Sequence, residues 1–393
     1  MRTRTHILLA AGGTGGHMFP AAALARELKR RGRSVSLLTD QRGLRYPGLL
    51  RDIDHEVISA VSLSSGGIDR IKGWLLLAKS IHEAVRFLRR KRVGMVVGFG
   101  GYPALPGLAA ARLLRIPFVL HEQNSVLGRV NRLFAASAKS LALSFQPTAR
   151  VPPRAQDRCA VTGNPVRQEI AKIGKDPYPA ISESRMLRLL IVGGSQGAKV
   201  FSDIVPQAIS LLPAAQRQRI QVTQQCRQED IERVAKIYHA FSIHAEIAPF
   251  FKDLPDRLRW AHLVISRAGA TTLAEVTTAG RPALLVPLSI ATDDHQRSNA
   301  EALIASGGGW LILETEFTSA NLAKKLIKLF AKPHELRTAS KAALELAKPD
   351  ATKRLAEIVE AFLPKLEKSA DPAFKPKTKN PPAHQARKKR VRA

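Results

Sequence analysis

The 393-residue sequence predicts an α/β protein with two similar domains, each built on a parallel sheet. The main observation is a repeated unit: an apolar run, a glycine cluster and a helical pattern follow one another at residues 6–31 and again from residue 187. Short apolar runs alternate with helical patterns elsewhere, as in parallel sheets with crossover helices. The length also exceeds what one hydrophobic core usually organises. We expect domains at residues 1–163 and 164–348.

The first unit predicts a site for an anion. Six largely apolar, uncharged residues from His6 predict a buried strand, and residues 12–16 predict a tight turn. A helix should follow, with Pro20 in its first turn and Gly32 just past its end. Backbone N–H groups of such a turn attract phosphate. No Gly-Lys-Ser/Thr follows, and Met18 stands where a dinucleotide fingerprint needs its third glycine.

Two polar residues near this turn leave alternatives open. Asp40 ends the next expected strand, residues 34–39, where an acid that binds a ribose would lie. His17 stands at the mouth of the turn. Its imidazole could act as a general base, or it could serve capping or packing.

A third strand, from Met95, should end in the glycine cluster 98–101, and a helix at 105–114 should lead to a strand at 117–120. Polar residues that follow a parallel strand lie where open sheets bind ligands. We expect Asn124 to contact a polar ligand. His121 and Glu122 are expected to form a buried pair that holds the loop.

The proline-rich stretch 151–165 predicts a linker, after which the second series begins. Strands are expected at 187–192, 221–225, 244–248, 263–266 and 283–287, with a glycine turn at 193–198. Thr272 and Glu275 stand three residues apart after the fourth of these strands. That spacing fits a capping box, and it also fits a carboxylate that accepts hydrogen bonds from a ribose.

The composition indicates an anionic partner. Lys and Arg number 62 against 32 Asp and Glu, a net charge of +30. Such a charge attracts polyanions, anionic lipid and phosphorylated substrates. Nucleic acid is not expected, because zinc-finger spacing and aromatic RNA-binding motifs are missing and aromatics make up only 5%. Cys159 and Cys226 are expected to be reduced thiols of a cytosolic protein. The basic tail at 365–393 is expected to be disordered.

Residues 70–92 combine helical apolar spacing with abundant positive charge. The stripe consists of Ile71, Trp74, Leu75, Ala78, Ile81, Val85 and Leu88. One interpretation is a crossover helix packed on the sheet with a solvated basic face. The other is a surface that meets anionic lipid. Both can hold, since the start can be exposed while the end packs. No apolar run reaches the roughly 18 residues that cross a bilayer.

Seven motifs in order carry a resemblance to a known family. They are Gly-Gly-Thr-Gly-Gly-His, Gly-Phe-Gly-Gly-Tyr, His-Glu-Gln-Asn, Gly-Asn-Pro-Val-Arg, Gly-Gly-Ser-Gln-Gly-Ala, Ser-Arg-Ala-Gly-Ala-Thr-Thr-Leu-Ala-Glu and His-Gln-Arg-Ser-Asn-Ala. Together they resemble the MurG family, bacterial transferases of N-acetylglucosamine from UDP-N-acetylglucosamine to lipid I. The likeness spans about residues 6–362. It implies the GT-B fold, in which two Rossmann-like domains face each other across a cleft, and a helix at 349–364 that returns to the first domain.

The resemblance also implies the site residues. The residues expected to bind UDP-N-acetylglucosamine are Thr14, Gly15, Gly16, Asn124, Arg167, Ser195, Phe251 through its main chain, Ala270, Thr271, Thr272, Leu273, Glu275 and Gln296. His17 is the candidate base. The resemblance assigns the nucleotide to the C-terminal domain, so that the first glycine turn becomes the acceptor side and Asp40 loses its ribose role.

The implied reaction inverts the anomeric carbon and forms a β-1,4 link to the 4-hydroxyl of the muramyl residue, giving lipid II. Glycine-turn amides and helix dipoles can stabilise the departing UDP. No metal or cofactor is expected, because no Asp-x-Asp motif stands at a strand end. The implied location is the cytoplasmic face of the bacterial inner membrane, with lipid I, an anionic surface and other cell-wall enzymes as partners.

Two rivals remain. A UDP-N-acetylglucosamine 2-epimerase would share the architecture, but it needs a cluster of acids in the cleft that the strand ends lack. A polyanion-binding protein would use the basic surface and tail.

Overall fold

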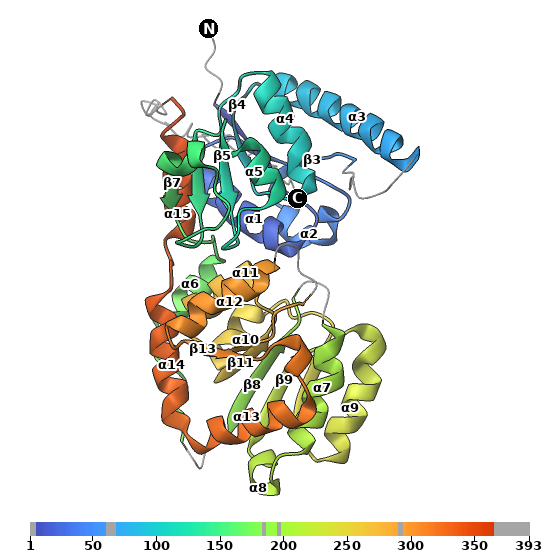
Figure 1. Cartoon of the computed structure of the whole chain (residues 1–393), viewed down its shortest axis with the longest axis vertical. Coiled ribbons are helices and arrows are strands. Elements are labelled where there is room, and N and C mark those ends of the chain that lie inside the picture. Colours follow the sequence, from blue (N-terminus) through green and yellow to red (C-terminus); the bar gives the residue numbers. More distant parts are fainter. Residues whose placement is uncertain (1–4, 60–67, 183–185, 195–197, 290–293, 365–393) are drawn as a thin grey trace, which may run out of the picture.

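The computed structural model describes residues 5–59, 68–182, 186–194, 198–289 and 294–364. It contains two parallel sheets, each with helices packed on it, arranged one above the other in Figure 1. The predicted class, an α/β protein with two parallel-sheet domains, is confirmed.

The N-terminal sheet has seven strands in the order β3-β2-β1-β4-β5-β6-β7. The strands are β1 (His6–Ala10), β2 (Val35–Thr39), β3 (Asp54–Val57), β4 (Val93–Gly98), β5 (Phe118–Glu122), β6 (Ser140–Leu143) and β7 (Cys159–Val161). Its helices are α1 (Gly15–Arg30), α2 (Pro47–Leu50), α3 (Ile68–Arg90), α4 (Leu105–Leu113) and α5 (Arg129–Ala135).

The C-terminal sheet has six strands in the order β10-β9-β8-β11-β12-β13. They are β8 (Leu187–Val192), β9 (Ile220–Gln225), β10 (His244–Ala248), β11 (Leu263–Ser266), β12 (Ala283–Leu285) and β13 (Gly309–Leu311). The helices that follow the first domain are α6 (Gln168–Ile173), α7 (Lys199–Ser210), α8 (Ala214–Arg217), α9 (Ile231–Ala240), α10 (Leu254–Trp260), α11 (Ala270–Thr278), α12 (His295–Ala305), α13 (Ser319–Ala331), α14 (Pro333–Glu345) and α15 (Ala351–Glu360).

The central strands carry apolar side chains on both faces. In β1, Ile7 and Leu9 belong to one buried cluster, while Leu8 and Ala10 belong to another. Successive side chains of a strand point to opposite faces, so the strand needs an unbroken apolar run when helices cover both sides. The strand order reverses beside β1 and beside β8, and at such points the carboxyl edge of a sheet binds ligands. Both glycine turns lie at these edges.

The helix after the first glycine turn begins earlier than expected. The prediction put Pro20 in the first turn, but α1 starts at Gly15 and encloses Pro20. Proline has no N–H to donate to the carbonyl four residues earlier. The Gly16 carbonyl therefore lacks its usual helical donor and is left to accept a hydrogen bond from the other domain.

Four strands were not predicted: β3, β6, β7 and β13. Each has only three or four residues, and three of them are edge strands. The predicted linker at 151–165 was partly wrong, because β7 lies inside it and pairs with β6. So short a strand, half-buried along its length, carries little pattern.

The last described helix, α15, packs on the N-terminal domain (Figure 1). Its residues Leu355 and Val359 join the cluster that contains β1, and Glu360 pairs with Arg31 and Arg33 at 2.9 and 2.8 Å. The last described helix therefore belongs, by its contacts, to the N-terminal domain. The tail at 365–393 lies outside the described residues.

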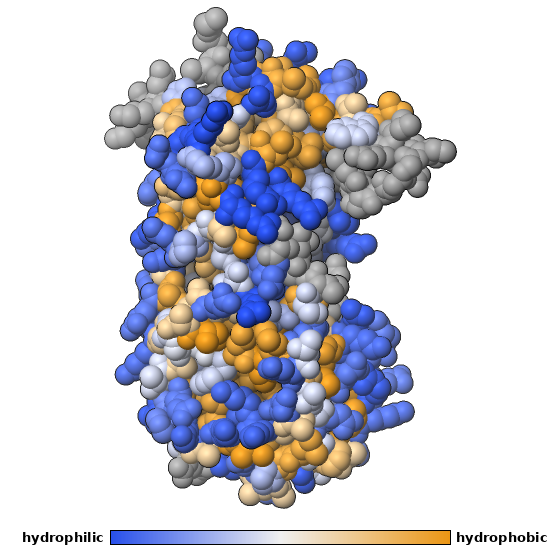
Figure 2. All heavy atoms as spheres, viewed as in Figure 1, coloured by the Kyte–Doolittle hydropathy of each residue, from blue (hydrophilic) through white to orange (hydrophobic). Residues whose placement is uncertain are grey.

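Helix α3 is exposed around Trp74 and buried toward its end. Trp74 and Leu75 are 56% and 67% exposed, whereas Phe87 and Leu88 lie in the core. Figure 2 shows hydrophobic side chains on the exposed part of this helix. The side chain of Ile71 lies outside the description, and Ala78 is exposed. Among the described helices, none is long and apolar enough to cross a bilayer.

Candidate active site

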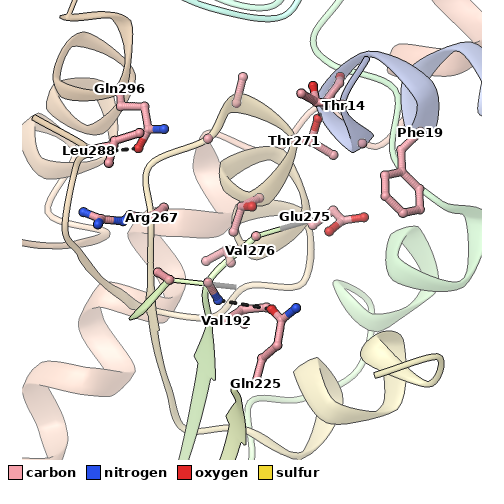
Figure 3. A pocket seen from close by; sticks show the side chains of 18 of the residues that line it. Thr14, Phe19, Val192, Gln225, Arg267, Thr271, Glu275, Val276, Leu288 and Gln296 are labelled. Atoms are coloured by element: carbon pink, nitrogen blue, oxygen red, sulfur yellow. Dashed lines mark hydrogen bonds between the residues drawn. The ribbon is translucent and has the colours of Figure 1, made fainter. Parts of the chain in front are cut away.

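A cavity of about 730 Å³ lies between the two domains. The N-terminal domain lines it with the start of α1 and the loop after β5. The C-terminal domain contributes the turn after β8, the loop after β10 and the first turns of α11 and α12. Figure 3 shows side chains of both domains pointing into this space.

Most of the expected site residues line this cavity. They are Thr14, Gly15, Gly16, His17, Asn124, Arg167, Phe251, Ala270, Thr271, Thr272, Glu275 and Gln296. Leu273 does not line it, since its side chain is buried in the C-terminal core. Ser195 lies outside the described residues, between Gly194 and Ala198, both of which line the cavity.

Asp40 holds the first glycine turn in place. Its Oδ1 accepts hydrogen bonds from the N–H groups of Gly13 and Gly43, at 2.8 and 3.1 Å, and its Oδ2 pairs with Arg42 at 2.7 Å. The side chain is buried and does not line the cavity. Gly13 adopts a φ of +81°, which glycine tolerates without strain. Asp40 thus shapes the turn rather than facing a ligand.

His17 lies in the first turn of α1, in the wall of the cavity. Its ring packs against Gly101, where a Cβ would come within 3.1 Å of the ring carbon Cε1. Burial lowers the pKa of His17 to about 4, against a weaker opposing effect of a hydrogen bond with the Gly12 backbone. The imidazole is therefore neutral at pH 7 and can accept a proton.

Thr271 joins the first turns of α1 and α11. Its hydroxyl donates a hydrogen bond to the Gly16 carbonyl at 3.2 Å, the acceptor that Pro20 leaves without a helical donor. Figure 3 shows Thr271 beside Thr14 on the facing helix. A proline in one domain thus creates the acceptor that binds the other domain.

Glu275 pairs with Arg167 inside the cavity wall. Its Oε1 accepts hydrogen bonds from Nε and Nη2 of Arg167, at 2.9 and 2.8 Å, and the guanidinium lies 5.1 Å from the ring centre of Phe19. Burial raises the pKa of Glu275, and Arg167 opposes that shift. The capping-box alternative is wrong, because α11 begins at Ala270 and Glu275 lies in its second turn.

The loop that carries Asn124 is held by a buried carboxylate. Glu122 accepts hydrogen bonds from the backbone N–H groups of Asn124 and Gly128 and from the side-chain amides of Asn124 and Asn131, at 2.8–3.2 Å. His121 is fully buried, and its Nε2 lies 3.2 Å from the Gly163 carbonyl oxygen. Both residues are buried and hold the loop, as expected.

Several residues of the cavity were not singled out from the sequence. They are Phe19, Tyr46, Gln225, Arg227, Arg267, His295 and Glu314. The hydroxyl of Tyr46 accepts a hydrogen bond from the Gly15 N–H at 3.0 Å, although Tyr46 stands in a turn-rich segment without pattern. Arg267 pairs with Glu314, which follows a strand that was missed. Gln225, Arg227 and Arg267 carried a usable signal, because each ends or closely follows a predicted strand.

No group of three or more His, Cys, Asp or Glu side chains within the described ranges is arranged to hold a metal ion. Cys159 and Cys226 are free thiols. The polar chemistry of the cavity comes from amides, hydroxyls, two arginine–glutamate pairs, two histidines and the cationic side chains of Lys199 and Arg227.

A buried histidine predicts a pH-dependent stability. Burial lowers the pKa of His121 to about 4, against about 6.5 in the unfolded chain. Between these values the unfolded chain binds the extra proton, so folding stability falls as the pH drops below 6.5 and gains nothing above it. We expect His121→Gln to lose stability at pH 7.5, with a gap to the wild type that narrows by up to about 3 kcal/mol near pH 4. Urea unfolding at several pH values measures this, and a constant gap would contradict it.

Comparisons with known proteins give the family. The glycosyltransferase family 28 N-terminal domain matches residues 7–143, and the C-terminal domain of that family matches residues 188–355. A UDP-N-acetylglucosamine--N-acetylmuramyl-(pentapeptide) pyrophosphoryl-undecaprenol N-acetylglucosamine transferase of Sphingopyxis alaskensis is 46% identical over 362 residues, 92% of each chain. The protein of the same name from Granulibacter bethesdensis is 49% identical over 91% of this chain and 94% of its own.

Solved structures agree with this match. The crystal structure of Acinetobacter baumannii MurG has a TM-score of 0.72 and 32% identity, and covers 91% of this chain and 99% of its own. A UDP-GlcNAc 2-epimerase from Neisseria meningitidis has a TM-score of 0.62 at 15% identity, covering 90% of this chain and 98% of its own, which shows a shared fold alone. The arrangement of two sheets around one cavity is that of the GT-B fold, and the chain belongs to glycosyltransferase family 28 and, within it, to the MurG family.

Proposed function

We propose that this protein transfers N-acetylglucosamine from UDP-N-acetylglucosamine to the 4-hydroxyl of the muramyl residue of lipid I, forming the β-1,4 link of lipid II. The observation that carries the proposal is the cavity between the domains, which the first glycine turn lines on one side and the starts of α11 and α12 line on the other. The names of the relatives support the choice of substrates.

The nucleotide sugar is assigned to the C-terminal wall. The N-terminus of α11 presents free backbone N–H groups and a positive dipole end, which suit a diphosphate. Both hydrogen bonds from Arg167 use Oε1 of Glu275. Oε2 has no hydrogen-bond partner among the described residues, so it can accept from the ribose hydroxyls. Gln296, whose Oε1 accepts from the Leu288 N–H at 3.0 Å, keeps its amide group for the sugar hydroxyls.

The reaction is a single displacement at the anomeric carbon. His17 takes the proton from the acceptor hydroxyl as the new bond forms and the bond to UDP breaks. The helix N-terminus and the glycine-turn amides stabilise the negative charge that develops on UDP. Burial lowers the pKa of His17 and so favours the neutral imidazole that this role requires.

Binding to an anionic membrane surface is part of the proposal. Trp74, Leu75 and Leu76 are exposed on one stretch of α3, in a chain of net charge +30. Apolar side chains beside positive charge favour the interface of anionic lipid.

The double variant Trp74→Ser/Leu75→Ser should bind vesicles of phosphatidylglycerol and phosphatidylcholine at least about tenfold more weakly, because it removes the two most exposed large apolar side chains in the described part of α3. Co-sedimentation measures the change. Leu211→Ser, at a residue 58% exposed after α7 in the other domain, is the matched control and should bind as the wild type does. Equal binding by all three proteins would remove α3 from the proposal.

The function is tested by incubating the purified protein with UDP-N-acetylglucosamine and a lipid I analogue in EDTA. We expect UDP release that depends on the acceptor. If none occurs, adding magnesium separates a failure of the metal-free mechanism from a failure of the transferase assignment. The polyanion-binding rival is tested with a truncation that ends at Pro364. The truncated protein should keep transferase activity, and loss of all transferase activity would count against the proposed function, whereas loss of nucleic-acid binding alone would not.

A further inference from the structure

Asn299 joins the two domains through one fully buried amide. It lies in the second turn of α12 and is 0% exposed. Its Oδ1 accepts hydrogen bonds from the backbone N–H and the hydroxyl of Ser125, at 2.8 and 3.0 Å. Its Nδ2 donates to Oδ1 of Asn124 at 3.1 Å and to the Ala268 carbonyl at 3.2 Å. Both lone pairs and both protons of the amide are therefore used.

The partners of Asn299 come from three segments that are far apart in the chain. Asn124 and Ser125 belong to the loop after β5 in the N-terminal domain, whereas Ala268 follows β11 in the C-terminal domain. Asn299 itself stands one helical turn after Gln296, on the helix whose first turn lines the cavity. A single side chain thus relates the positions of two cavity residues from different domains, Asn124 and Gln296.

The orientation of the Asn124 side chain is determined from both ends. Its Nδ2 donates to Oε1 of Glu122 at 3.2 Å, and its Oδ1 accepts from Asn299. Glu122 belongs to the same domain as Asn124, so it fixes the amide only within that domain. The hydrogen bond from Asn299 fixes the position of the Asn124 amide relative to the C-terminal domain. Asn299 does not line the cavity between the domains, so it acts through Asn124 rather than on the ligand.

We infer that Asn299 is a positioning residue, which holds Asn124 of one domain in register with Gln296 of the other and so completes the sugar end of the cavity. This inference rests on the proposed function. The geometry requires asparagine, because an aspartate lacks the two donors and an alanine leaves the Ser125 N–H and the Ala268 carbonyl buried without a partner. A shift of about 1 Å at such a site can lower turnover by about 100-fold.

The test is a double-mutant cycle on kcat/KM for UDP-N-acetylglucosamine with Asn299→Ala, Asn124→Ala and the double variant. Asn299→Ala should lower kcat/KM by about 10- to 100-fold in the wild type. In the Asn124→Ala background, Asn299→Ala should lower kcat/KM by less than about twofold, because the side chain that Asn299 positions is already gone. The fall in melting temperature should be similar in both backgrounds.

Ser125→Ala is the matched control. It removes one hydrogen bond to the same Oδ1 and keeps the bond from Asn299 to Asn124, so melting temperature should fall while kcat/KM stays within about twofold of the wild type. If Asn299→Ala does not fold, Asn299→Ser takes its place in the cycle. The inference is overturned if the fold loss of kcat/KM in the double variant equals the product of the losses in Asn299→Ala and Asn124→Ala. It is also overturned if Asn299→Ala lowers melting temperature and leaves kcat/KM unchanged.

Calorimetric titration of UDP-N-acetylglucosamine repeats the cycle on Kd and needs no turnover. A wild-type protein that binds the nucleotide sugar but releases no UDP with a lipid I analogue would refute the proposed function. The Kd cycle would still decide the role of Asn299, since coupled losses support positioning and independent losses overturn it.

Discussion

His17→Ala should lower kcat by about 10²- to 10⁴-fold, the range by which a positioned general base accelerates a reaction. The KM for UDP-N-acetylglucosamine should change by less than about threefold, because the proposed donor contacts come from Arg167, Glu275 and Gln296. Steady-state kinetics with a lipid I analogue measure both constants. A kcat within about threefold of the wild type would remove His17 as the base.

The pH profile gives a second measurement on His17. Its pKa in the folded protein is lowered to about 4 by burial, so the base stays unprotonated throughout the neutral range. The loss of kcat/KM that His17 causes should therefore occur as the pH falls toward 4, not near 6.5. His17→Ala should lose this acidic limb. A limb with a pKa near 6.5 in the wild type would contradict the buried, neutral state.

A neighbouring glycine supplies the structural control for His17. Gly101 has a φ of +70°, and a Cβ there would meet the imidazole ring at 3.1 Å. Gly101→Ala should displace the ring without removing it, and should lower kcat by less than His17→Ala does. His262→Gln, at a buried histidine of the other domain, should leave kcat unchanged.

Most of the strands that were predicted lie inside the sheets and are buried, although the edge strand β10, which is partly exposed, was also predicted to the residue. The range 187–192 was predicted to the residue, because helices cover both faces of β8 and every position but Arg188 is apolar. The missed strands are short, and edge strands such as β7 need no continuous apolar run. Pattern reasoning found the centres of both sheets and thereby the edges where the cavity forms.

The positions of site residues could be predicted, but not their partners. Asn124 follows β5 of the N-terminal sheet, and Glu275 lies in the helix after β11 of the C-terminal sheet, so strand order places each near the carboxyl edge of its own sheet. The bond from Thr271 to the Gly16 carbonyl depends on a proline inside a helix of the other domain. The spacing of Thr272 and Glu275 suggested a capping box, yet Gly269 had already started the helix. Contacts between distant segments have no local pattern.

The second large effect is expected at the buried ion pair. Arg167→Leu should destabilise the fold by about 3–5 kcal/mol, because it leaves the Glu275 carboxylate buried without its partner. Glu275→Leu should cost less, about 1–2 kcal/mol, since the Arg167 side chain is 18% exposed and also rests on Phe19. Urea unfolding measures both values, and equal losses would contradict the asymmetry.

The double variant Arg167→Leu/Glu275→Leu separates stability from donor binding. Replacing both charges with leucine should recover most of the stability lost by Arg167→Leu, because a buried ion pair contributes little over packed apolar side chains. The KM for UDP-N-acetylglucosamine should nevertheless remain raised by at least about tenfold, since leucine offers no acceptor to the ribose and no donor to the nucleotide. A double variant with restored stability and a normal KM would make the pair a purely structural one. With a raised KM, the pair that holds the wall of the cavity would also be the pair that binds the nucleotide.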